Sequence, residues 1–347
     1  MGGQKKAKQQ SKEPRSADVA PRRNPKASRR GLFNFSFRQN NMSTIAFILI
    51  LGGFALAKYE MRRYIRSSYL GGPSLIQNPG GCGTYEPKVP SCTPHGNNCG
   101  HLVYDSFASA EEVSALRAIA ARGMALGGGA GGPTILDLQS GALSLGDKFV
   151  DVWSVFNATE GVKAFTRSEV AVYADVVERI RLLAESTFGV SSGGRATGGG
   201  TRGAKLAAAS AARLHLTAPT FFSRISGDKQ PKTAHDEYWH THVDLEQYGS
   251  FVITSLLYLA DAGADFEGGQ FEIMPRGTTY KSDGTAQPLT TVTPSRGRLV
   301  LFSSGSEHPH RVTRVTSGER LALTIAFSCD EGAAIHDFLG RALPVPA

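Results

Sequence analysis

The last third of the chain consists of short β-type segments, and this pattern constrains the fold more than any other feature. Between residues 212 and 329, turns that contain Gly, Pro or Asp separate the segments, and no helical repeat of useful length interrupts them. Many short strands within about 120 residues favour a sandwich or barrel of the jelly-roll kind. The segments are RLHLTAPTFFSRI, SFVITSLLYLA, GGQFEIM, GRLVLFS, HRVTRV and RLALTIAFS.

The part of the chain before these strands is expected to be helical. Residues 109–112 (SAEE) and 166–169 (TRSE) both match the capping box, in which a hydroxyl and a Glu side chain satisfy backbone N–H groups at a helix start. Apolar residues at helical spacing follow each box, and Gly189 can end the second helix. Residues 109–205 are therefore predicted to form a helical support region, in which GGGAGG is a flexible loop and the low-complexity loop 191–205 marks a domain boundary.

A long uncharged run lies near the N-terminus. Residues 39–57 carry no charged side chain, and as a helix they would span roughly 28 Å, enough for a thin bilayer. We therefore expect a transmembrane signal-anchor over 42–57 behind a basic, disordered tail, residues 1–41. A cleaved signal peptide is the alternative, but its charged region would be unusually long and no clean cleavage site follows. A buried soluble helix is disfavoured because the basic tail abuts the run directly.

The positive charge is confined to the tail. Residues 1–40 hold eleven Lys or Arg and two acidic residues, although the net charge of the whole chain is only +8. The folded part is thus close to neutral, which argues against a nucleic-acid partner. The positive-inside rule places the tail in the cytosol and the rest in the lumen, as in a single-pass type II protein of the ER or Golgi membrane. The Asn157-Ala-Thr159 sequon, a possible N-glycosylation site at Asn157, agrees with that orientation.

All four cysteines follow the uncharged run. An oxidising lumen would let Cys82, Cys92, Cys99 and Cys329 pair, in any of three connectivities. A zinc site is the alternative, although its spacing fits no standard motif; its ligands would be Cys92, His95, Cys99 and His101. Residues 58–108, rich in Gly, Pro and Cys, are expected to form a cysteine-tied stalk.

Three side chains have the pattern of a metal site. His242 and Asp244 are two residues apart, so on an extended chain they project from the same face. His310, at the start of a later strand, can complete a set of two histidines and one carboxylate. That set leaves three adjacent metal positions open, which suits a non-haem iron(II) site that binds a bidentate co-substrate together with O₂.

A buried arginine is predicted near this site. In RLALTIAF, which begins at Arg320, every second residue from Leu321 onward is large and apolar, whereas the alternate face is small except for Arg320. A single guanidinium above small neighbours suits a buried carboxylate ligand, because it offers paired hydrogen bonds and leaves room beside them. An arginine exposed to solvent on an edge strand is the alternative.

Two further histidines compete as ligands. His240 shares a face with His242, but the spacing to Asp244 favours His242, and we expect His240 to support the ligands or to face the substrate. His308 competes with His310, but only His310 precedes Arg320 by ten residues in a His-Arg-Val context.

Taken together, HTHVD, SLLYL, GGQF, GRLVLF, HPHRV and GERLALTIAF resemble the prolyl-4-hydroxylase-type group of iron- and 2-oxoglutarate-dependent oxygenases. The tail, the uncharged run, the cysteine-rich stretch and GGPTILDLQSGALSLGDKFV also resemble a membrane-anchored member of the group. The resemblance implies a double-stranded β-helix, or jelly roll, as the catalytic domain over residues 206–330, followed by a C-terminal tail, residues 331–347.

The resemblance also implies roles for individual residues. His242, Asp244 and His310 match the iron ligands, Arg320 matches the residue that pairs with the far carboxylate of 2-oxoglutarate, and Tyr258 matches a tyrosine that binds the same co-substrate. It implies Fe(2+), 2-oxoglutarate and L-ascorbate as cofactors, and hydroxylation of a protein or peptide substrate, for example at proline, with release of succinate and CO₂. Two other functions stay open: a catalytically degenerate membrane-anchored scaffold, and a cupin-like metalloprotein that does not use Arg320.

Overall fold

A computed structural model describes residues 75–78, 80–85, 89, 92–94, 98–158, 165–189, 191–192, 214–233, 236–279 and 286–335. The chain divides into two compact units, Met1–Lys58 and Tyr59–Ala347, and every described residue belongs to the second. The expected cytosolic tail and membrane span therefore lie outside the described residues. Within the described part of the chain, no helix combines the length and apolar character needed to cross a bilayer.

A sheet of eleven strands forms the body of the second unit. In chain order its strands are β1 (Ile76–Gln77), β3 (Gly100–Tyr104), β4 (Gly128–Gly129), β5 (Thr134–Leu136), β6 (Ala142–Gly146), β7 (Lys148–Asp151), β9 (His215–Ser226), β10 (Ile253–Tyr258), β11 (Phe266–Gly268), β14 (Leu299–Ser303) and β16 (Val315–Ser328). They pair in the order β1-β3-β14-β10-β16-β9-β5-β6-β4, with β11 added on β16 and β7 on β6. The long central pairs, β16 with β9 and β10 with β14 and β16, are antiparallel.

Two smaller sheets and four helices complete the described structure. The three-stranded sheet has the order β13-β12-β15, and β2 pairs with β8. These strands are β2 (Cys92–Thr93), β8 (Ser191–Ser192), β12 (Phe271–Ile273), β13 (Thr290–Val292) and β15 (His310–Val312). The helices are α2 (Ala110–Met124), α3 (Val152–Ala158), α4 (Arg167–Phe188) and α6 (Asp244–Tyr248), and a 3-10 turn, η5, follows at Glu331–Ala333.

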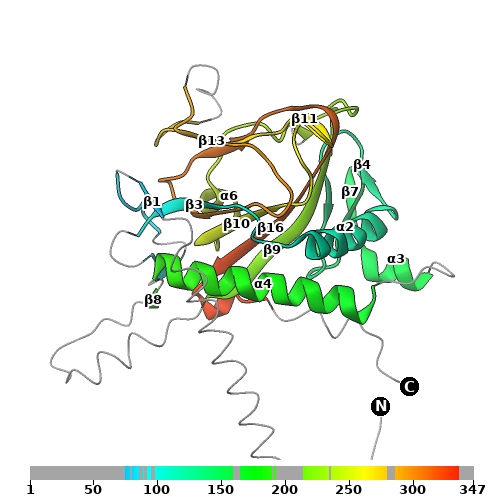
Figure 1. Ribbon diagram of the computed structural model, residues 1–347, viewed down its shortest axis with the longest axis horizontal. Helices are drawn as coiled ribbons and strands as arrows, with labels where there is room; N and C mark the ends of the chain where they lie inside the picture. The colour runs from blue at the N-terminus through cyan, green and yellow to red at the C-terminus, as the bar shows by residue number, and fades with distance from the viewer. Residues whose placement is uncertain are drawn as a thin grey trace, which may run out of the picture. The chain divides into compact units, whose positions relative to one another are not determined.

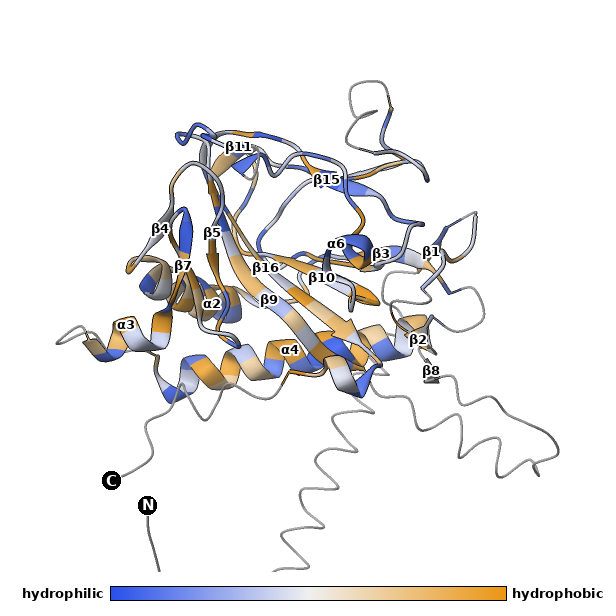
Figure 2. Cartoon of the chain, turned by 180° about the vertical axis from the view of Figure 1, so that it is seen from behind, coloured by the Kyte–Doolittle hydropathy of each residue, from blue (hydrophilic) through white to orange (hydrophobic). Residues whose placement is uncertain are grey.

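The main sheet separates two hydrophobic cores. On one face, α2 and α4 pack against a core that includes Leu323, Ile325 and Phe327 of β16. On the other face, β12 and β13 cover a smaller core that includes Ala322 of β16 and Tyr258 of β10. Figure 1 shows α4 along one side of the sheet and β13 on the other, and Figure 2 shows apolar residues along β5, β10 and α4. The strict alternation predicted for β16, and the mainly β jelly-roll class, are thus confirmed.

Both predicted capping boxes are present. The Ser109 hydroxyl accepts from the Glu112 N–H, and the Glu112 carboxylate accepts from the Ser109 N–H at 2.9 Å. Thr166 and Glu169 make the same exchange at the start of α4, and Gly189 ends that helix with a φ of 55°, in the left-handed region that favours glycine. Local sequence therefore determined where these two helices begin.

The expected domain boundary near residue 205 is wrong. Strand β5, in the region predicted to be helical, pairs with β9, and Ile135 lies opposite Ser223. Strands β4 to β7 thus extend the main sheet beyond the predicted catalytic domain. The GGGAGG run, expected to be a flexible loop, contains β4, which pairs in parallel with β6. A side chain at Gly127 would collide with the Ser144 carbonyl oxygen, so glycine is needed for this close approach.

The last part of the expected stalk is also part of the body. Strand β3 lies between β1 and β14 in the main sheet, and Leu102 on this strand is fully buried. Disulfides join Cys82 to Cys99 and Cys92 to Cys329, so the second ties this segment to the end of β16. Because both candidate zinc cysteines are oxidised, the zinc alternative is ruled out.

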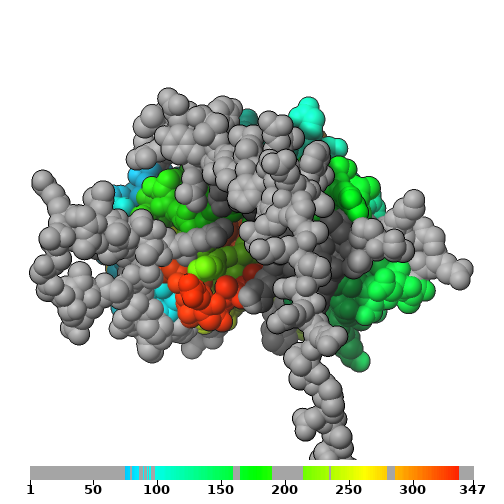
Figure 3. All heavy atoms as spheres, turned by 90° about the horizontal axis from the view of Figure 1, so that it is seen from below, coloured from blue at the N-terminus to red at the C-terminus, as the bar shows by residue number. Residues whose placement is uncertain are grey.

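The start of the expected C-terminal tail is ordered as well. Thr217 of β9 bridges to Ala334, and the N–H of Ile335 donates to the Leu216 carbonyl at 2.9 Å. Figure 3, seen from below, shows the orange-red atoms of the end of the described chain beside yellow-green atoms of an earlier segment. Residues 331–335 therefore continue the packed body beyond the predicted limit of the catalytic domain.

Candidate metal centre

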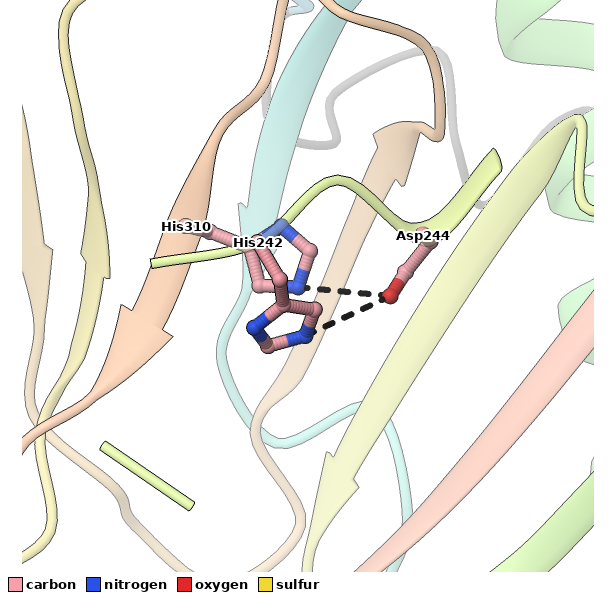
Figure 4. A group of neighbouring side chains, drawn as sticks. All are labelled: His242, Asp244 and His310. Atoms are coloured by element: carbon pink, nitrogen blue, oxygen red, sulfur yellow. Dashed lines mark ion pairs between the residues drawn. The ribbon is translucent and has the colours of Figure 1, made fainter. Parts of the chain in front are cut away.

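The structure brings His242, Asp244 and His310 together. Asp244 Oδ1 lies 3.6 Å from His242 Nε2 and 3.5 Å from His310 Nε2, as the dashed lines in Figure 4 show. One potential ligand atom from each residue lies within 4.8 Å of the other two, and among the described residues this is the only such group of three. Two imidazole nitrogens and one carboxylate oxygen on one side of a site are the donor set of an open non-haem iron(II) centre.

The backbone explains how these three residues meet. His242 forms an isolated bridge to His310, with N–H to carbonyl distances of 3.0 and 2.9 Å in the two directions. After that bridge the chain turns into α6, which begins at Asp244, and the Leu245 N–H donates to the Ser304 carbonyl at 3.0 Å. Between the two residues Val243 is extended, with φ −122° and ψ 121°, so His242 and Asp244 project towards the same site, as predicted. The helical turn begins only at Asp244 itself.

Both histidine rings are oriented by backbone carbonyl groups. Nδ1 of His242 lies 3.0 Å from the His240 carbonyl oxygen, and Nδ1 of His310 lies 3.0 Å from the His308 carbonyl oxygen. A carbonyl oxygen only accepts, so each Nδ1 carries the proton and donates it. In a neutral ring this leaves Nε2 as the lone-pair donor, directed at the centre of the group.

The charged forms of Asp244 and His310 stabilise each other. Burial by itself would raise the pKa of Asp244, but attraction to His310 and the hydrogen bonds it accepts outweigh burial, so this pKa lies below its usual value. Burial by itself would lower the pKa of His310, but the Asp244 carboxylate raises it above its usual value. Each group therefore favours the charged form of the other.

The group is open on one side. The His242 side chain is 34% exposed, whereas the side chains of Asp244 and His310 are each 6% exposed. The rings of Phe271 and Phe302 lie 5.2 and 4.9 Å from the His310 ring, so the inner side is apolar. Access to the centre is thus from the His242 side.

A buried arginine with incomplete hydrogen bonding lies on the same face of the main sheet. Arg320 is 2% exposed, its Nε donates to the Gly269 carbonyl at 2.9 Å, and its Cζ lies 5.4 Å from the centre of the Tyr258 ring. Neither Arg320 Nη2 nor the Tyr258 hydroxyl has a hydrogen-bond partner among the described residues. Burial lowers the pKa of Arg320 and raises that of Tyr258 to about 12. Two unsatisfied buried donors side by side are suited to the carboxylate of a ligand.

The other candidate histidines lie outside the group of three. Nε2 of His240 lies 2.7 Å from Glu237 Oε2, in a half-exposed pair. His308 is buried with Nδ1 2.8 Å from the Ser303 carbonyl oxygen, and burial lowers its pKa to about 4. His240 and His308 therefore serve local hydrogen bonds in this structure.

One contact of the site was missed in the sequence. The Thr254 hydroxyl lies 2.6 Å from Asp244 Oδ2, and it is buried in β10. A polar residue in the apolar SFVITSLLYLA segment was the available signal. Thr254 and Tyr258 also share a strand face, because they are four residues apart.

Comparison with known proteins places the chain among oxygenases. Residues 224–328 match the model of the 2OG-Fe(II) oxygenase superfamily. The human 2-oxoglutarate and iron-dependent oxygenase domain-containing protein 3 is 42% identical over 250 residues, which cover 72% of this chain and 68% of that protein. Chicken prolyl 3-hydroxylase 1 is 26% identical over 78% of this chain and 33% of its own length. These matches confirm the resemblance inferred from the motifs.

One solved structure aligns with much of the chain. A Pseudomonas putida prolyl-4-hydroxylase aligns with 66% of this chain and 92% of its own, at 19% identity and a TM-score of 0.36. The family assignment rests on the sequence relatives.

Proposed function

This chain belongs to the 2OG-Fe(II) oxygenase superfamily, and from that premise we propose that it hydroxylates a peptidyl residue such as proline. The enzyme class is that of the 2-oxoglutarate-dependent dioxygenases, which use iron(II) and 2-oxoglutarate, with ascorbate as the usual reductant. The observation that carries the proposal is the group of three ligand atoms on the sheet face that also buries Arg320, whose Nη2 has no partner among the described residues.

The residues present fit both cofactors. His242, Asp244 and His310 would hold iron(II), and Arg320 with Tyr258 would hold the far carboxylate of 2-oxoglutarate. The two parts are linked through β10, where Thr254 contacts Asp244 and Tyr258 lies beside Arg320. The four residue steps from Thr254 to Tyr258 span roughly 13 Å of strand. When bound, iron(II) and 2-oxoglutarate supply the oxidation of a substrate C–H bond by O₂, with succinate and CO₂ as the other products.

The protein's own contribution is positioning and shielding. Carbonyl groups fix the tautomers of both histidines, and the aromatic rings of Phe271 and Phe302 keep the inner side apolar. The substrate would approach on the exposed side of His242. One relative, chicken prolyl 3-hydroxylase 1, is a hydroxylase of prolyl residues by its name, and this supports a peptidyl substrate.

Turnover of the full-length chain tests this proposal. Purified protein with iron(II), ascorbate and 2-oxoglutarate is expected to form succinate in step with a 16 Da increase in a peptide or protein substrate. A scaffold on the same fold would retain no stoichiometric metal, so elemental analysis separates the two functions. Metal-loaded protein that forms no succinate with broad peptide and protein panels would contradict hydroxylase activity.

We further propose a location for the enzyme, as a single-pass type II protein of the ER or Golgi membrane with the catalytic body in the lumen. The uncharged run over 42–57 and the basic tail before it support the anchor and its orientation. Two disulfides support an oxidising compartment. Asn157 is exposed in α3, where a glycan could be attached without disturbing the core.

Glycosylation offers a test of that location. When the full chain is expressed in animal cells, Asn157→Gln is expected to remove one N-glycan, because it destroys the sequon that a lumenal body would expose. The measurement is electrophoretic mobility before and after digestion with an N-glycosidase. Thr159→Ala should give the same shift, since it breaks the sequon but leaves Asn157 in place. A wild-type chain whose mobility does not respond to the glycosidase would argue against a lumenal Asn157.

A further inference from the structure

A chain of two buried hydroxyl groups ends on the metal-site carboxylate. The Thr254 Oγ1 lies 2.6 Å from Asp244 Oδ2 and 2.8 Å from the Ser304 Oγ. Thr254 is 3% exposed and Ser304 is fully buried, so water does not compete for these bonds. The three residues come from β10, from the chain just after β14, and from the start of α6.

The direction of both hydrogen bonds follows from the chemistry of the groups. An ionised carboxylate only accepts, so Thr254 must donate its single hydroxyl proton to Asp244 Oδ2. Thr254 then has lone pairs but no proton left, so Ser304 must be the donor in the second bond. The protons therefore run in one order, from Ser304 through Thr254 to Asp244.

This order of donors gives the two carboxylate oxygens of Asp244 different partners. Oδ2 is occupied by the Thr254 hydroxyl, whereas Oδ1 lies 3.6 and 3.5 Å from the two histidine Nε2 atoms. The backbone assists, because the Ser304 carbonyl accepts from the Leu245 N–H at 3.0 Å and so fixes the start of α6. Rotation of the carboxylate would break the bond to Thr254 and leave a buried hydroxyl without its acceptor.

We propose that Thr254, supported by Ser304, is a positioning residue that presents a single oxygen of Asp244, Oδ1, to the metal. The inference rests on the proposed function, because it assumes that Asp244 is a metal ligand. A carboxylate that binds through one oxygen leaves three metal positions for a bidentate co-substrate and O₂, whereas a chelating carboxylate would occupy one of them.

The test is Mn(II) affinity of the purified full-length chain, measured by isothermal titration without 2-oxoglutarate or substrate. Thr254→Val keeps the shape of the side chain but removes the donor, and it is expected to weaken Mn(II) binding about 10- to 100-fold. Thr254→Ser keeps the hydroxyl and is expected to restore an affinity close to wild type. Ser304→Ala should weaken binding less than Thr254→Val, because Thr254 can still donate to Asp244.

Ser255 provides a matched control on the same strand. It is fully buried, and its hydroxyl donates to the Ile325 carbonyl at 3.0 Å. As the neighbour of Thr254 it points to the opposite sheet face, so Ser255→Ala removes a buried hydroxyl from β10 without touching Asp244. The Mn(II) affinity of the Ser255→Ala variant is expected to equal that of wild type.

The outcomes separate this inference from the proposed function. Wild-type affinity in a folded Thr254→Val protein, or an equal loss in Ser255→Ala, would overturn the positioning role. A wild-type chain that binds no Mn(II) would overturn both ideas. Because the titration contains no 2-oxoglutarate, a chain that binds Mn(II) and responds to Thr254→Val but never forms succinate contradicts the hydroxylase function alone.

Discussion

Asp244→Ala is expected to abolish stoichiometric metal binding and, with it, the formation of succinate from 2-oxoglutarate. Asp244 is the one acidic member of the group of three, and its loss leaves only two histidine nitrogens to bind the metal. Substitution of a group that only hydrogen-bonds a metal ligand already costs about 10- to 100-fold in metal affinity, so loss of the ligand itself should exceed about 100-fold. Elemental analysis and Mn(II) titration of the full-length variant measure the effect.

The control for this variant is a surface carboxylate. Asp228 is exposed in the turn after β9, and Asp228→Ala should leave metal content and turnover unchanged. Asp244→Asn is a sharper companion, because it keeps the shape of the side chain and removes its charge. Retention of one metal per chain in Asp244→Ala would exclude this carboxylate as a ligand.

Arg320→Met is expected to raise the KM for 2-oxoglutarate about 100-fold, because two charge-assisted hydrogen bonds to a carboxylate are lost. Without co-substrate the variant should be at least as stable as wild type, since the native guanidinium is buried with one nitrogen unsatisfied. When 2-oxoglutarate is present at 100 times its Kd, the free energy of unfolding of the wild-type protein should rise by about 2.7 kcal/mol. That of the variant should hardly change. Thermal unfolding with and without 2-oxoglutarate measures both effects.

Arg320→Lys distinguishes charge from geometry at this position. Lysine keeps the positive charge but lacks the planar guanidinium with its paired N–H donors. The KM of Arg320→Lys for 2-oxoglutarate should therefore lie between those of wild type and Arg320→Met. Iron(II) content should be normal in both variants, because Arg320 is not one of the three ligands. A cupin-like enzyme that does not use 2-oxoglutarate would keep its full activity in Arg320→Met, and that result would refute the assigned role.

The features that followed from the sequence are those with a local cause. Strict alternation in β16 predicted a buried Arg320 opposite Leu323 and Ile325, because strand residues two apart share a face. The capping boxes located the starts of α2 and α4, since the hydrogen bonds that make them join residues three apart. The choice of His310 over His308 depended on order along the chain, and the structure places His310 in the group.

The features that were missed depend on contacts between distant parts of the chain. Asp244 begins a helical turn because the Leu245 N–H meets the Ser304 carbonyl, a partner far away in sequence. Thr254 likewise has a role only because the folded chain places its hydroxyl 2.6 Å from Asp244 Oδ2. The cysteine-rich stretch has a stalk-like composition, yet its β3 strand lies between β1 and β14 in the main sheet and Cys92 pairs with Cys329. Composition cannot specify such pairings.

A crystal structure of the full chain with Mn(II) and 2-oxoglutarate, recorded without O₂, is the most direct test of the central claim. We expect an anomalous peak within bonding distance of His242 Nε2, Asp244 Oδ1 and His310 Nε2. The keto acid end of 2-oxoglutarate should lie on that metal, with its far carboxylate on Arg320 and the Tyr258 hydroxyl. A metal bound to other side chains, or a far carboxylate directed away from Arg320, would contradict the account.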